Sequence, residues 1–308
     1  MKLVLANNQT PQFVEYYGAI KNRYGDILDY TNYVSLLFFF DSDSPSPVAV
    51  SVLSSGKQLT DYDGVYINGY LDTYELAAAT AICANFLGVP FVNHELANSG
   101  SLSKLTMYAK LTAAGVSLPK TVAGSAKALT TLKDFTFPAV LKRADADRGI
   151  DNYKVKSMAE VESLLTSQEA LSIWILQDYV PNDGFYLVSY YLDQASFCIF
   201  RSLEERPDGN EQKAHMFKPK GGGNASLIPL PEVPKSILEE CSKALKVMDR
   251  QIGSVDCIYD SATDKVYILE VNYNPQLVTI ETYKQERLEA FVAAMQSDWL
   301  PYKSAGKN

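Results

Sequence analysis

Two strand-like stretches near the C-terminus carry acidic side chains among apolar residues. The first runs from Ser254 to Asp260 and the second from Lys265 to Asn272. The polar stretch between them, Ser261 to Lys265, is short enough to connect neighbouring antiparallel strands. The sequence therefore predicts a β-hairpin whose strands place acids at interior positions.

The predicted pairing of this hairpin brings carboxylates together. If Asp260 pairs with Val266, Asp256 lies directly opposite Glu270, and Asn272 shares the face of Glu270 because strand side chains alternate with period two. Like charges directly opposite one another destabilise a sheet, so this pair favours a cation between its members. Carboxylate and amide oxygens suit magnesium. The alternative interpretation is a solvated face with unpaired acids.

The first hundred residues alternate strand-like and helix-like stretches. The Ala-rich segment from Asp72 to Leu87 predicts a helix that ends at Gly88. Strands separated by helices indicate a parallel sheet covered by helices, so we expect an α/β domain here. The strand-like runs are residues 2–6, 35–40, 48–53, 65–67 and 89–92.

The rest of the chain predicts two further lobes of mixed α+β structure. We place the domain boundaries at residues 1–97, 98–180 and 181–308. The predicted helices are residues 104–114, 158–165, 234–252 and 283–297, and the predicted strands are residues 137–142, 173–180, 185–192 and 196–201, besides the hairpin.

Composition excludes several classes of function. Of the 308 residues, 47% are hydrophobic and 21% charged, which is typical of a globular protein. A net charge of −8 argues against nucleic-acid binding, which needs clustered Lys and Arg. The four cysteines form no CxxC pair and lie in apolar stretches, so we expect reduced, buried thiols. No apolar run is long enough for a signal peptide or a membrane span, and we expect a cytoplasmic protein without membrane partners.

Several basic residues stand where they could bind phosphate. Lys142 ends an apolar strand just before the polar loop from Arg143 to Asp151, and Arg201 also lies at a strand end. Lys104 lies on the helix that opens the middle unit. Each of these side chains, taken alone, fits better with an ordinary cation that reaches solvent.

Two features that would act through the backbone have the same ambiguity. The Gly-rich stretch from Lys218 to Asn224 could bind an anion through successive backbone amides, although it is not a Walker A loop. The strand exit from Gln177 to Val180 joins two lobes, where backbone groups could contact an adenine ring. An ordinary edge-strand exit would have the same sequence.

Taken together and in this order, these features resemble the ATP-grasp superfamily, especially its amino-acid and peptide ligases, which include the ribosomal-protein glutamate ligases and the D-alanine–D-alanine ligases. The resemblance covers roughly residues 98–282. Its most specific motif is Val255-Asp256 followed by Leu269-Glu270-Val271-Asn272-Tyr273-Asn274-Pro275, which matches the family's metal-binding Asp and Glu-x-Asn-x-x-Pro signature. The supporting motifs are Ser103-Lys104-Leu105 with residues 114–121, the lysine strand 137–142, the linker 177–180 and the Gly-Gly loop 220–227.

The resemblance implies an ATP-grasp fold in which a pre-ATP-grasp α/β domain precedes two lobes that clasp ATP. It implies a ligase that activates a carboxylate as an acyl phosphate, uses ATP and Mg²⁺ as cofactors, and releases ADP and phosphate. The implied site residues are Lys104, Lys142, Arg148, Gln177, Asp178, Tyr179, Val180 and Asp183 for the nucleotide, Asp256, Glu270 and Asn272 for the metal, and Arg201, Lys220 and Asn272 for catalysis.

Substrates and assembly are less closely defined. The resemblance implies a small-molecule or peptide carboxylate and an amine as partners, and a homo-oligomer is a family expectation. The loop from Arg143 to Ile150 departs from the family pattern, because it has one Gly and two acids where family members are rich in Gly and Ser. Two alternative functions therefore stay open, namely a nucleotide-binding regulator with little turnover and an ATP-grasp phosphotransferase.

Overall fold

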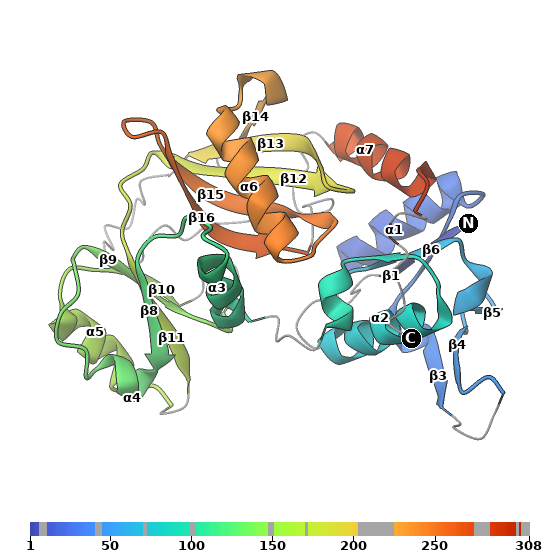
Figure 1. Ribbon diagram of the computed structural model, residues 1–308, viewed down its shortest axis with the longest axis horizontal. Helices are drawn as coiled ribbons and strands as arrows, with labels where there is room; N and C mark the ends of the chain where they lie inside the picture. Colours follow the sequence, from blue (N-terminus) through green and yellow to red (C-terminus); the bar gives the residue numbers. More distant parts are fainter. Residues whose placement is uncertain are drawn as a thin grey trace.

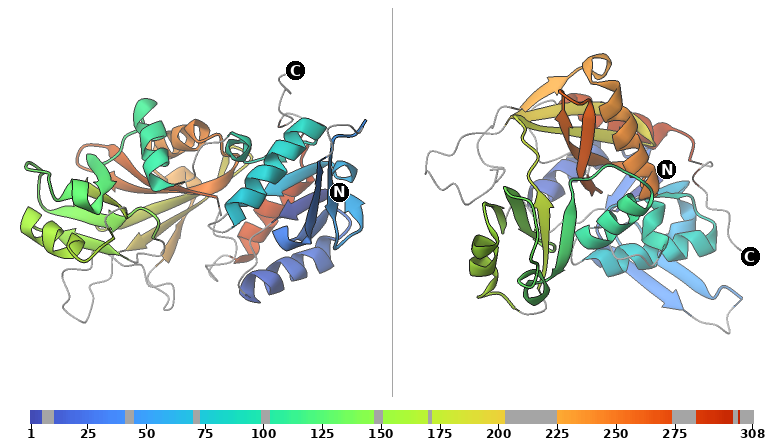
Figure 2. Two further views of the ribbon diagram at one scale, coloured as in Figure 1. Left: turned by 90° about the horizontal axis from the view of Figure 1, so that it is seen from below. Right: turned by 60° about the vertical axis from the view of Figure 1, so that its left-hand side comes forward.

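A computed structural model describes residues 1–5, 11–40, 45–69, 73–98, 103–146, 151–169, 172–202, 225–273, 284–299 and 302. Its strands form four sheets. In Figures 1 and 2 the sheet of residues 121–178 and the N-terminal sheets lie at opposite ends of the molecule, and a five-stranded sheet of residues 184–272 lies between them.

The N-terminal sheet is parallel, as predicted, with strand order β2-β1-β6-β7. Every residue of its two central strands, β1 and β6, is buried, which is usual for a sheet covered on both faces. The strands are β1 (Lys2–Leu5), β2 (Leu28–Thr31), β6 (Gly64–Ile67) and β7 (Phe91–Val92), and the helices are α1 (Pro11–Tyr24) and α2 (Tyr74–Leu87). The α2 helix ends at Gly88, whose φ of 67° is left-handed, as predicted for a glycine C-cap.

Two of the predicted N-terminal strands are not part of this parallel sheet, and our prediction was wrong for them. The strands β3 (Leu36–Phe40) and β4 (Val48–Val52) pair antiparallel with each other, and β5 (Lys57–Gln58) pairs with β4. The connection between β3 and β4 is too short for the helical crossover that a parallel pair requires. The sequence analysis also missed α1 and β2. Short 3₁₀ helices complete this part: η1 (Tyr33–Ser35), η2 (Leu59–Asp61) and η4 (His94–Ala97).

The central lobe is an antiparallel sheet with strand order β10-β9-β11-β8. Its strands are β8 (Thr121–Ser125), β9 (Ala139–Arg143), β10 (Asn152–Val155) and β11 (Ile173–Asp178), and its helices are α4 (Ala126–Leu129) and α5 (Met158–Leu165). Leu141 and Trp174 of the sheet pack in one apolar core with Leu129 and Val161 of the helices. Helices therefore cover one face of this sheet.

The C-terminal lobe is a five-stranded antiparallel sheet with order β14-β13-β12-β15-β16. Its strands are β12 (Gly184–Tyr191), β13 (Gln194–Ser202), β14 (Ala225–Ile228), β15 (Ile252–Asp260) and β16 (Lys265–Asn272). The η5 turn (Leu230–Glu232) leads to α6 (Lys235–Val247), which packs against β15 and β16. The last described helix, α7 (Lys284–Gln296), packs against β12 and β13 and lies beside α1 in Figure 1.

The α3 helix (Lys104–Ala113) packs with the C-terminal lobe, although it precedes the central lobe in the chain. Its buried residues Met107, Tyr108 and Leu111 belong to the same core as Ile237 of α6 and Val271 of β16. We keep residues 1–97, 98–180 and 181–308 as proposed domains, with α3 docked on the third. This docking matters for the site, because α3 carries Lys104.

All four cysteines are buried and free, as predicted: Cys83, Cys198, Cys241 and Cys257. None of the described helices combines the length and apolar character needed to cross a membrane.

Candidate active site

The β15–β16 hairpin places its acids as the sequence predicts. Asp256 lies opposite Glu270, and Asn272 pairs with Ser254. The prediction was wrong at the turn, where Asp260 pairs with Lys265 instead of Val266. The turn is one residue shorter than assumed, because Asp264 closes it in a left-handed conformation with φ of 51°. A β-bulge after Asp256 then shifts the register by one residue and restores the predicted pairing at the acids.

Asp256 is held where a free carboxylate is unfavourable. Burial, followed by repulsion from Glu270, raises the pKa of Asp256 to about 7, although Arg201 and Asn272 act in the opposite direction. Asn272 Nδ2 donates to Asp256 Oδ2 over 3.4 Å, whereas the buried Oδ1 has no hydrogen-bond partner among the described residues. A buried, unsatisfied carboxylate oxygen facing a second carboxylate fits a divalent cation that binds oxygen ligands.

Lys104 lies beside this pair of acids. Ser103 caps the N-terminus of α3 by accepting a hydrogen bond from Thr106 N. The cap fixes the first turn of the helix, and Lys104 Nζ then lies 3.6 Å from Glu270 Oε1. Lys104 Nζ also donates to the carbonyl oxygen of Ala146, next to the loop after β9. One lysine thus connects the acidic hairpin with the loop that follows Lys142.

Lys142 is brought to the same place from the central lobe. Its Nζ donates to Tyr108 Oη over 2.7 Å and to Gln177 Oε1 over 3.0 Å. Burial lowers the pKa of Lys142 to about 8, although attraction to Glu270 opposes this shift. Lys142 therefore does not reach outward to solvent, and its electrostatic environment includes the same carboxylate as that of Lys104.

Tyr108 is a site residue that the sequence analysis missed. Its hydroxyl accepts from Lys142 and donates to the carbonyl oxygen of Leu269 over 2.9 Å. It therefore bridges the central lobe and β16. The sequence contains one usable signal, because Tyr108 follows Lys104 by four residues and so lies on the same face of α3.

The segment Gln177–Asp183 connects the central and C-terminal sheets. The Gln177 side chain is buried and engaged, since its Nε2 donates to Thr121 Oγ1 over 2.8 Å while its Oε1 accepts from Lys142. Tyr179 N donates to Pro138 O over 3.2 Å. The linker between the lobes thus contains Asp178, Tyr179, Val180 and Asp183, as the sequence predicts. Gln177 has a different part, because its side chain bonds to Lys142 and so orients that lysine.

Arg201 approaches the hairpin from the far end of β13. It is 7% exposed. Burial lowers the pKa of Arg201, whereas the charge of Asp256 raises it and that of Arg287 lowers it. Arg287, on α7, is fully buried and was not singled out from the sequence. A buried cation thus faces Asp256 from the side opposite to Glu270's strand.

Two predicted site residues, Arg148 and Lys220, lie outside the described residues, as does the whole Gly-rich stretch 218–224. One acid of the unusual loop after β9 is described. Asp145 forms an ion pair with Arg143 Nε at 2.8 Å, and Arg143 Nη1 also pairs with Asp151 at 2.9 Å. The charge of Asp145 is therefore directed to Arg143.

Comparisons with known proteins support the fold. No family model and no curated protein matches the sequence. Solved structures do match. The ATP-grasp ligase PsnB, complexed with a minimal precursor, Mg and ADP, is similar with a TM-score of 0.64, 12% identity, and coverage of 96% of this chain and 97% of that one.

Two further structures agree. D-alanine–D-alanine ligase from Bacillus anthracis has a TM-score of 0.59 at 14% identity and covers 96% of this chain and 97% of its own. The RimK domain protein ATP-grasp from Sphaerobacter thermophilus has a TM-score of 0.58 at 14% identity, over 97% and 98%. These similarities extend over nearly the whole chain, so they establish the fold, including the N-terminal domain.

We predict that Tyr108→Phe destabilises the protein by about 1–2 kcal/mol, because it removes a hydroxyl that bridges Lys142 and the Leu269 carbonyl. Urea denaturation would measure this change. The matched control is Tyr24→Phe, whose half-buried ring has no hydroxyl hydrogen bond among the described residues, with an expected change within about 0.5 kcal/mol. Equal stability of the two variants would contradict the bridging role.

Proposed function

Starting from the ATP-grasp fold of this chain, we propose that it is an ATP- and Mg²⁺-dependent ligase that joins a carboxylate to an amine. The observation that carries this proposal is the pairing of Asp256 with Glu270 beside Lys104. The pair is unfavourable without a cation, and the neighbouring lysines are suited to phosphate oxygens. A Mg·nucleotide supplies both the cation and the phosphates.

The cation would be held by Asp256, Glu270 and Asn272, with nucleotide phosphates and water as the remaining ligands. No group of three or more acidic, His or Cys side chains gathers within the described ranges, so a share of the ligands from the nucleotide fits this site. When bound, Mg²⁺ neutralises charge on the β- and γ-phosphate oxygens.

The basic residues have distinct proposed roles. Lys104 and Lys142 bind the α- and β-phosphates of ATP, and the backbone of the linker from Asp178 to Asp183 contacts the adenine ring. Gln177 holds Lys142 in position through the hydrogen bond described above. Arg201 stabilises the transferring phosphoryl group. Arg148 and Lys220, which lie outside the described residues, complete the phosphate contacts in this proposal.

The proposed reaction has two steps. A carboxylate oxygen of the first substrate attacks the γ-phosphorus of ATP, the bond to the β,γ-bridging oxygen breaks, and ADP leaves. The amine nitrogen of the second substrate then attacks the acyl carbon, phosphate leaves and the nitrogen loses a proton. Phosphoryl transfer of this kind depends on positioning and positive charge more than on covalent help from the protein. The cations around Asp256 supply that charge.

A regulator without turnover is less favoured by the arrangement. Its support was the acidic loop after Lys142, but Asp145 is paired with Arg143. A phosphotransferase would use the same nucleotide site, and product analysis separates it from a ligase. We also propose a peptide or small-molecule carboxylate as substrate, since PsnB has been solved with its precursor peptide. The four free, buried thiols support a cytoplasmic location.

The ligase proposal predicts ADP release from Mg·ATP that depends on added amino acids or short peptides. Glu270→Gln should lower this rate roughly 100-fold or more, because it removes one charge from the cation site. Coupled ADP assays and product mass spectrometry provide the measurement. The control is Glu239→Gln, an exposed glutamate on α6. ATP binding without release in any pool would favour the regulator, and absence of ATP binding would refute the proposal.

The shifted pKa of Lys142 predicts that ATP affinity depends on pH. ATP binds the charged amine, which the free protein keeps below pH 8 and loses above it. The association constant should therefore be close to its maximum at pH 7, fall to about half of it at pH 8, and then fall by up to about tenfold per pH unit. Calorimetric titration between pH 7 and 9.5 would measure it. Lys142→Arg keeps its charge and should abolish the dependence, whereas an unchanged dependence in this variant would assign it to another group.

A further inference from the structure

The edge strand that carries Glu270 and Asn272 is held by neighbouring loop and helix residues instead of by another strand, and Ile268 N, for example, donates to the carbonyl oxygen of Ser117 over 2.9 Å. β16 lies at one edge of the five-stranded sheet. Along this edge, the carbonyl oxygen of Leu269 accepts from Tyr108 and Val271 N donates to Met107 Sδ over 3.3 Å. An edge strand without such contacts leaves its backbone groups unpaired. The orientation of the two cation ligands therefore depends on these contacts.

Arg250 makes a further contact on this edge. Its Nη1 donates to the carbonyl oxygen of Val271 over 2.5 Å, and its guanidinium carbon lies 3.5 Å from the centroid of the Tyr273 ring. Val271 is the residue between Glu270 and Asn272. Arg250 thus fixes the backbone at the point that separates the two ligands.

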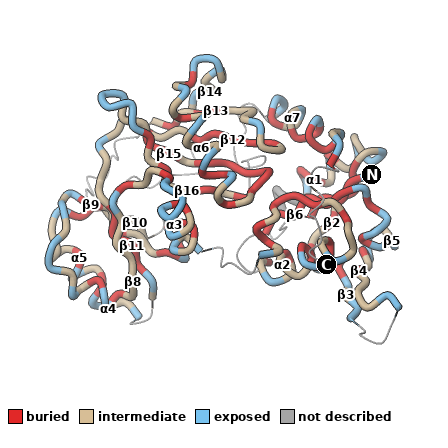
Figure 3. The backbone as a smooth tube through the Cα atoms, in the orientation of Figure 1, coloured by how far each residue is buried: buried red, intermediate tan, exposed pale blue. Residues whose placement is uncertain are grey.

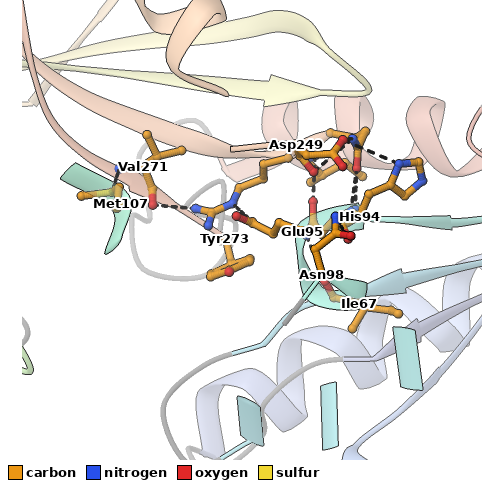
Figure 4. Close-up of polar contacts among 12 residues, drawn as sticks. Ile67, His94, Glu95, Asn98, Met107, Asp249, Val271 and Tyr273 are labelled. Carbon is orange, nitrogen blue, oxygen red and sulfur yellow. Dashed lines mark hydrogen bonds and ion pairs between the residues drawn. The ribbon is translucent and has the colours of Figure 1, made fainter. Parts of the chain in front are cut away.

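The N-terminal domain holds Arg250 in turn. Glu95, on η4, forms a hydrogen-bonded ion pair with Arg250 Nε, and both residues are 2% exposed. Gln251 Oε1 adds a neighbouring contact by accepting from Asn93 N over 2.7 Å. Figure 4 shows Glu95, Val271 and Tyr273 in the same group of polar contacts. A planar guanidinium with several fixed donors is well suited to such a junction.

We propose that Glu95 and Arg250 are positioning residues for the cation site, through which the N-terminal domain sets the geometry of Glu270 and Asn272. This inference rests on the proposed function of the hairpin. It assigns to the N-terminal domain a role in metal binding that is separate from any contact with substrate. Without Arg250, the Val271 carbonyl loses its donor and the spacing of the two ligands is no longer fixed.

The test replaces the whole ion pair, because removing one partner leaves a buried unpaired charge and risks unfolding, whereas apolar replacement of both is well tolerated. In Glu95→Leu/Arg250→Met, Mn²⁺ binding to the ADP complex is measured by electron paramagnetic resonance. Calorimetry with EDTA measures ADP binding alone. We expect Mn²⁺ affinity to fall at least tenfold while metal-free ADP affinity changes less than twofold. A merely structural role would lower both or neither.

Control variants distinguish a specific effect on the cation site from the general effect of removing a buried ion pair. Lys21→Met/Asp29→Leu removes another ion pair, 2.6 Å long, between α1 and β2, and should leave Mn²⁺ binding unchanged. Arg250→Lys keeps the charge with fewer donors and should be intermediate. Unchanged Mn²⁺ affinity in the folded double variant would overturn the positioning role alone. A wild-type protein that binds no Mn²⁺ with ADP would overturn the proposed function, and this inference with it.

A second, independent feature is the open edge of β3. No described strand pairs with its outer edge, and its sequence, Leu36-Leu37-Phe38-Phe39-Phe40, contains neither charge nor proline. Phe39 and Phe40 are 50% and 69% exposed. The β3–β4 hairpin extends from the N-terminal domain, and the described residues nearest its turn, 39–40 and 45–46, are exposed (Figure 3). Folded proteins normally protect such edges with charges, proline or a cover.

The absence of charge along this edge and the apolar area exposed there both fit pairing with a second copy of the chain. A strand without charges pairs antiparallel with its own copy around a two-fold axis without bringing like charges together. The exposed parts of Val34, Leu37, Leu53, Phe39 and Phe40 correspond to about three whole side chains. At roughly 150–200 Å² each, they would bury about 1,000 Å² over two copies, the lower limit for a specific interface.

We infer that β3 forms a homodimer interface by pairing with β3 of a second copy. Sedimentation equilibrium at micromolar concentrations should give a dimer for the wild type and a monomer for Phe39→Lys, which places a charge on the edge. Lys57→Ala, on β5 at the opposite edge of the same sheet, should remain dimeric. A monomeric wild type, or a dimeric Phe39→Lys, would overturn the inference.

Discussion

The repulsion between Asp256 and Glu270 is the interaction on which the rest of the site depends. Two carboxylates face each other on adjacent strands, and burial strengthens their repulsion because little solvent screens it. The surrounding chain responds with cations from three directions. Lys104 comes from α3, Arg201 from β13, and Lys142 from a different lobe. An acidic centre within a basic shell suits a metal–phosphate complex.

The distribution of these groups explains why the three parts of the chain form one site. α3 precedes the central lobe in sequence but packs on the C-terminal sheet, and Tyr108 on this helix connects Lys142 with β16. The N-terminal domain reaches the same strand through Glu95 and Arg250. Each lobe thus contributes to the arrangement around the acids, and a change in the orientation of one lobe would change the positions of these side chains.

Local patterns predicted most strands and helices but not always their partners. The period-two alternation places Asp256 opposite Glu270 despite an error of one residue at the turn, because a bulge compensates for the shorter loop. The same reasoning assigned β3 and β4 to the wrong sheet. A strand's apolar residues indicate that it is paired, whereas the length of the connection limits which neighbour it takes.

The sequence by itself determined the hairpin, the lysine strand and their order along the chain, because side-chain alternation and motif spacing are local properties. Tertiary structure alone decided that Tyr108 bridges Lys142 to β16 and that Glu95 pairs with Arg250. Glu95 and Arg250 are more than 150 residues apart, and no periodicity links them. Their meeting depends on how separate lobes pack, which is a long-range property of the fold.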